Sequence, residues 1–127
     1  MTEQTKLRLT NKEEIYISNL LKALGVPPHL LGYDYIKFTI LLIASEESYL
    51  RRIPKGLYSD IAEKFQTTPS RVERAIRHCI EVSFNRAKAE KMEEIFSYTI
   101  NINTGKLTNS EFLAVLGEYF RLHYIEE

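Results

Sequence analysis

Two apolar-periodic segments, residues 57–65 and 69–86, are separated by only three residues, and this spacing constrains the fold more than any other feature of the chain. In both segments, apolar side chains recur at the three- and four-residue intervals of an amphipathic helix. Pro69 opens the second segment, where a helix tolerates proline because the missing N–H group is not needed in the first turn. The pattern therefore predicts two helices joined by a tight turn.

The residues that would pack these two helices together fit a helix-turn-helix. This motif needs a small residue in the first helix where the second helix crosses it, and Ala62 is such a residue. Val72 and Ile76 lie at the spacing expected for the apolar anchors of the second helix. Gln66 stands where the turn usually has a glycine. We predict a helix-turn-helix whose second helix covers about residues 69–86.

Helix signals also occupy most of the remaining chain, whereas residues 99–103 alternate like a strand but have no partner strand. Those five residues are therefore predicted to form an extended loop. The other helices are predicted from the capping box at Thr10–Glu13 to Gly25, over residues 33–45 and 89–96, and from the capping box at Thr108–Glu111 toward Tyr124. The prediction is an all-α fold of about six helices around the helix-turn-helix, without a winged part or a receiver domain.

The composition allows one modest core, since 44% of the 127 residues are apolar. We expect a short N-terminal tail, residues 1–10, and a helical domain, residues 11–127. The sequence has no apolar run of membrane-spanning length and no secretory signal. A single cysteine, Cys79, excludes an internal disulfide. We therefore expect a cytoplasmic protein that does not associate with a membrane.

Positive charge is concentrated in the middle of a chain whose net charge is zero. Residues 51–91 hold ten basic and five acidic side chains, whereas both flanking segments carry a net negative charge. On a helical wheel, the second helix of the motif places its apolar residues on one half and its polar residues on the other. The residues on or bordering the polar half that we expect to bind an anionic partner are Ser70, Arg71, Glu73, Arg74, Arg77 and His78.

The chemistry of this polar half suits base recognition. The amino-terminal part of the second helix is the part that enters the major groove of DNA. Arginine pairs bidentately with guanine, and a carboxylate such as Glu73 accepts a hydrogen bond from cytosine. The alternative is a solvated face of i,i+4 ion pairs such as Glu73 with Arg77, which contribute only a few tenths of a kcal/mol each. Such pairs would not account for three clustered arginines.

The same residues resemble a known family. The chain is similar to the C-terminal DNA-binding effector domain of the sporulation master response regulator, the stage zero sporulation protein A family. The similarity lies in the runs 57–65, 67–68 and 70–78, and extends to Leu24–Pro27, Gly32–Tyr35, Phe96–Thr99 and Thr108–Phe112. The resemblance implies a sporulation transcription regulator whose helix 69–86 reads a TGNCGAA-like box, with two copies bound head to tail as a homodimer on the DNA.

The resemblance also assigns roles to individual residues. Arg71, Glu73 and Arg74 become base readers, and Ser70, Arg77 and His78 become contacts to the backbone or groove edge. It implies that an RNA polymerase sigma factor is contacted through Phe96, Ser97 and Tyr98. About ten residues precede the first helix, so we expect this chain to lack the family's phosphoacceptor receiver domain.

Other functions have weaker support in the sequence. The three histidines are far apart and the five glycines form no phosphate-binding loop, so we expect no enzyme activity, no cofactor and no metal site. A protein-interaction module remains the alternative. It would bind the full-length regulator or a sigma factor without reading DNA, and the acidic residues Glu111, Glu118, Glu126 and Glu127 would suit a basic partner.

Overall fold

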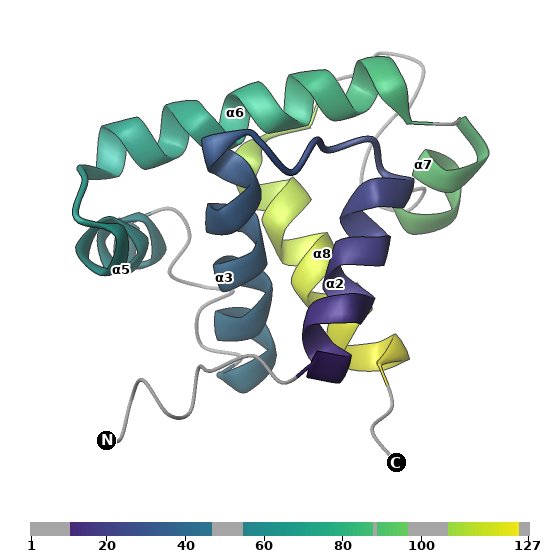
Figure 1. Ribbon diagram of the computed structural model, residues 1–127, viewed down its shortest axis with the longest axis horizontal. Helices are drawn as coiled ribbons and strands as arrows, with labels where there is room; N and C mark the ends of the chain where they lie inside the picture. The colour runs from purple at the N-terminus through teal and green to yellow at the C-terminus, as the bar shows by residue number, and fades with distance from the viewer. Residues whose placement is uncertain (1–10, 47–54, 88, 97–106, 125–127) are drawn as a thin grey trace.

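The computed structural model describes residues 11–46, 55–87, 89–96 and 107–124, and within these ranges the regular secondary structure is entirely α-helical. Figure 1 shows the arrangement. The helices are α2 (Asn11–Ala23), α3 (Leu31–Ser45), α5 (Lys55–Phe65), α6 (Pro69–Arg86), α7 (Ala89–Phe96) and α8 (Asn109–His123). The all-α prediction is confirmed. The strand-like segment 99–103 and Thr10 of the first capping box lie outside the described residues.

Helix α3 forms the centre of the core. It buries most of its length, from Gly32 to Ile43, which is the pattern of a helix surrounded by other elements rather than lying at a surface. It packs against both α6 and α8, and Phe65 of α5 contacts it edge-on at Tyr35 and Phe38. In Figure 1, α6 crosses over one end of α3 and one end of α8. The position of α6 is therefore set by the core beneath it.

Helix α6 packs against the core through the residues predicted to anchor it. Val72 and Ile76 are fully buried, and Ala62 of α5 is 4% exposed where the two helices meet. The α6 amino terminus is also built as predicted, because Pro69 occupies the first turn and the Thr68 hydroxyl accepts a hydrogen bond from the Arg71 N–H at 3.3 Å. This geometry confirms the helix-turn-helix packing and the bounds predicted for the second helix.

Gln66 adopts the conformation that usually selects glycine in the turn between α5 and α6. Its φ is 57°, which is left-handed, and Thr67 N–H donates to the Ala62 carbonyl at 2.9 Å to close the end of α5. A side chain with a Cβ is strained in this region by about 1 kcal/mol. Gln66 thus adopts the same turn conformation that glycine usually adopts here, at the cost of local strain.

Replacing Gln66 by glycine should relieve this strain. We expect Gln66→Gly to raise the free energy of unfolding by up to about 1 kcal/mol, partly offset by the greater entropy of glycine in the unfolded chain. Urea denaturation would measure the change, with Gln66→Ala as the control because it keeps the Cβ. Equal stability of the two variants would contradict the expected net gain.

Candidate nucleic-acid interface

One side of α6 is exposed along its amino-terminal half. The opposite side is buried through Val72, Ile76, Cys79, Ile80 and Ser83, so the intervening polar residues face solvent. Five of the six residues singled out in the sequence lie together there and are exposed; we call them the α6 ridge. The ridge consists of Ser70, Arg71, Glu73, Arg74 and His78.

The arginines of the α6 ridge form no ion pair with the carboxylates that the structure describes. Among the described residues, no ion pair involves Arg71 or Arg74, and none joins Glu73 to Arg77. Ion pairs do form elsewhere in the described ranges, between Lys37 and Glu14, Lys91 and Glu94, and Arg121 and Glu118. The structure therefore does not support the alternative of an ion-paired solvent face. With two arginines and one glutamate, the ridge keeps a net positive charge that attracts an anionic partner.

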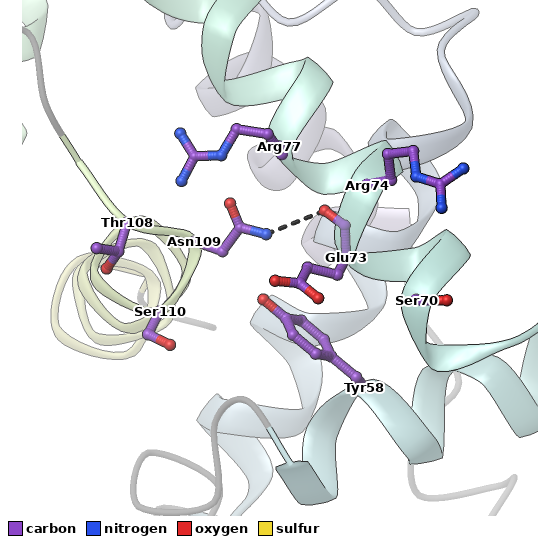
Figure 2. A pocket seen from close by; sticks show the side chains of 8 residues that line it. All are labelled: Tyr58, Ser70, Glu73, Arg74, Arg77, Thr108, Asn109 and Ser110. Atoms are coloured by element: carbon purple, nitrogen blue, oxygen red, sulfur yellow. Dashed lines mark hydrogen bonds between the residues drawn. The ribbon is translucent and has the colours of Figure 1, made fainter.

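A hollow lies on each side of the α6 ridge. The first hollow, between α6 and the start of α8, is shown in Figure 2 and is lined by Tyr58, Ser70, Glu73, Arg74, Arg77, Thr108, Asn109 and Ser110. The second lies between α6 and the start of α3 and is lined by residues 29–32, Arg71, Arg74, Ala75, Arg77, His78 and Glu81. A ridge between two hollows is a shape that can enter a groove of a larger partner.

Arg77 lies apart from the ridge. Its side chain is half-buried, and its Nη2 donates a hydrogen bond to the Leu107 carbonyl at 3.1 Å. Figure 2 shows the guanidinium groups of Arg74 and Arg77 pointing in opposite directions. The structure thus brings five of the six predicted residues to one exposed strip and directs the sixth toward the loop before α8.

Asn109 is a residue of this region that the sequence did not reveal as part of the site. It is 7% exposed, and its Nδ2 donates to the Glu73 carbonyl at 3.0 Å, as the dashed line in Figure 2 shows. The sequence places Asn109 in the capping box of α8, which is confirmed, but gives no sign of its contact with α6. The two residues are 36 positions apart, and no local pattern connects positions so distant.

Tyr58 of α5 completes the floor of the first hollow. Burial raises the pKa of its hydroxyl, hydrogen bonding with Asn109 lowers that pKa, the Glu73 carboxylate raises it and the Arg77 charge lowers it. The net shift is upward from the ordinary value of 10.0. The phenol is therefore neutral at physiological pH, and its negative form plays no part beside the ridge.

The predicted partner contact at Phe96 is not a surface feature. The Phe96 side chain is fully buried and stacks on Phe112, with ring centroids 5.3 Å apart. In this conformation its ring belongs to the core and offers no surface to a partner. Ser97 and Tyr98, the other residues of that prediction, lie outside the described residues.

No other chemical site stands out in the described ranges. They contain no group of three or more histidine, cysteine or acidic side chains placed to hold a metal ion. None of the helices in these ranges has the length and apolar character needed to cross a membrane. Cys79 is fully buried beside Gly32, and this burial raises the pKa of its thiol to about 11. The thiol is therefore a core group.

A comparison with protein families gives an extensive match. The model of the family described as "Sporulation initiation factor Spo0A C terminal" matches residues 17–120. The matched range begins within α2, ends within α8 and contains the whole helix-turn-helix.

The buried thiol predicts how stability depends on pH. The unfolded chain loses the Cys79 proton near pH 9, whereas the folded protein retains it to about pH 11. Since the folded state binds more protons between these values, the free energy of unfolding should fall as pH rises through this window. Urea unfolding at about pH 8 and about pH 10 would measure the fall, and Cys79→Ala should reduce it. Tyrosines titrate in both proteins, so an identical fall in the variant would contradict this assignment.

Proposed function

The chain belongs to the Spo0A C-terminal family of DNA-binding effector domains, and we propose that it recognises DNA by placing the α6 ridge in the major groove of a TGNCGAA-like box. The observation that carries the proposal is the exposure of Arg71 and Arg74 on one strip of α6 without an ion pair to any described residue. A positive ridge on the amino-terminal half of the second helix is where a helix-turn-helix contacts bases.

Within this proposal, the ridge residues divide between two tasks. Arg71, Glu73 and Arg74 read base edges, since arginine suits guanine and a carboxylate suits the cytosine amino group. Ser70 and His78 contact the sugar-phosphate backbone, as do the remaining N–H donors of Arg77. Glu73 favours sequence reading over simple phosphate binding, because a carboxylate is repelled by phosphate and gains only from a base that donates to it.

We propose further that two copies bind neighbouring boxes head to tail and regulate transcription. The test is binding of the purified protein to a duplex with two tandem boxes and to a scrambled duplex, each at several salt concentrations. Cooperative preference for the tandem boxes is the expected result. Weak binding to both duplexes, with equal and steep dependence on salt, would leave only nonspecific phosphate attraction.

The alternative, a module that binds the full-length regulator or a sigma factor without reading DNA, has less support. It depended on acidic side chains in the last third of the chain. Two of these are already engaged in α8, because Glu111 closes the capping box and Glu118 pairs with Arg121. Glu126 and Glu127 lie outside the described residues.

Arg71→Ala separates these functions. If Arg71 reads a base, the substitution should weaken binding to the tandem boxes by about 1–3 kcal/mol and reduce the preference over scrambled DNA. Fluorescence anisotropy with both duplexes would measure the two affinities. The matched control is Arg86→Ala, which removes an exposed arginine from the other end of α6 and should leave the preference unchanged. An unchanged preference in Arg71→Ala would contradict base reading.

A further inference from the structure

Two hydrogen bonds join α6 to the start of α8, one in each direction. Asn109 Nδ2 donates to the Glu73 carbonyl at 3.0 Å, and Arg77 Nη2 donates to the Leu107 carbonyl at 3.1 Å. Glu73 and Arg77 are one helical turn apart on α6, and the two α8-side residues flank Thr108. Because the bonds are separated along both elements, together they resist both sliding and rotation of α6; Figure 2 shows the first of them.

The α8 side of this attachment is itself held firmly. The Thr108 hydroxyl accepts from the Glu111 N–H at 3.1 Å, and the Thr108 N–H donates to the Glu111 carboxylate at 2.9 Å. Leu107, on one side of this capping box, is buried, and Phe112, on the other, is a fully buried core residue. Leu107 and Asn109, the residues that bond to α6, are therefore held in place by the capping box and the core.

The Asn109 amide lies in a buried place where a polar group is unfavourable. Its side chain is buried, and its Oδ1 has no hydrogen-bond partner among the described residues. An unsatisfied buried acceptor is destabilising, and an apolar residue of similar volume would avoid the loss. The one direct hydrogen bond from this amide to α6 goes to the backbone of Glu73, in the middle of the α6 ridge. The amide also hydrogen-bonds with Tyr58 of α5, so it joins the start of α8 to both helices of the helix-turn-helix and helps to place the ridge.

We propose that Asn109 is a positioning residue for sequence discrimination, which it controls through the Glu73 backbone without touching DNA. This inference rests on the function proposed above. Base readout requires donors and acceptors to be held within about 0.5 Å of their productive positions. Asn109, assisted by the Arg77–Leu107 hydrogen bond, fixes the height and rotation at which Arg71, Glu73 and Arg74 meet the base edges. Loss of the attachment leaves the charges of the ridge in place but allows its register to vary.

The test measures affinity for the tandem-box and scrambled duplexes across a range of salt concentrations, for the wild type and Asn109→Ala. We expect Asn109→Ala to lower the ratio of the two affinities by a factor of about 5 to 100, which is the discrimination that one bidentate base contact supplies. The dependence of scrambled-DNA binding on salt should stay the same, because no phosphate contact is removed. In the Arg71→Ala background, Asn109→Ala should reduce the ratio by less than it does alone, because both act through the same base contacts.

A control separates positioning from general destabilisation. Phe120→Leu weakens core packing at the other end of the same helix, where Phe120 contacts Tyr16 and Tyr124, and should lower the melting temperature without changing the affinity ratio. Three outcomes would overturn the inference while leaving the proposed function intact: an unchanged ratio in Asn109→Ala, a ratio lowered equally by Phe120→Leu, or a reduced salt dependence. A wild-type protein that does not distinguish the two duplexes would overturn the proposed function, and this inference with it.

Discussion

The close contact between α3 and α6 is the constraint on which the rest of the structure depends. At Gly32, an added Cβ would lie 2.5 Å from the Ala75 carbonyl oxygen and 2.6 Å from Cys79 Sγ. These separations are too short for any side chain, so only glycine allows the backbones to come this close. The packing at Gly32 fixes the distance between α6 and α3. The side of α6 that faces away from α3 is therefore exposed to solvent. The exposure of the α6 ridge is thus a result of packing beneath it.

Local patterns in the sequence were sufficient for most of the elements. The bounds of α6 and α7 match their predicted ranges, and the predicted capping box at Thr108 is present. Helix α3 begins at Leu31, two residues before the predicted start, because the Tyr33 N–H already bonds to the Leu30 carbonyl at 3.0 Å. Signals of this kind are readable because caps, prolines and apolar periodicity act over a few residues.

The candidate site was only partly predictable, for a physical reason. Helical periodicity placed Arg71, Glu73 and Arg74 on one polar side, since that depends on α6 alone. The direction of the Arg77 side chain and the contact of Asn109 depend on where α8 begins relative to α6. That relation results from packing of the whole core, and the sequence carries no local sign of it. The burial of Phe96 was missed for the same reason, because its ring partner, Phe112, belongs to a different helix.

The contact between α6 and DNA can be tested directly by titrating the isotopically labelled protein with the box duplex and following the backbone amides by NMR. If the α6 ridge meets DNA, the largest shift changes fall on residues 70–78, with smaller changes at the hollows beside the ridge. The exposed end of α8 around Leu122 should change little. Changes concentrated on α7 and the end of α8, with α6 unaffected, would contradict the claim that α6 is the surface that meets DNA.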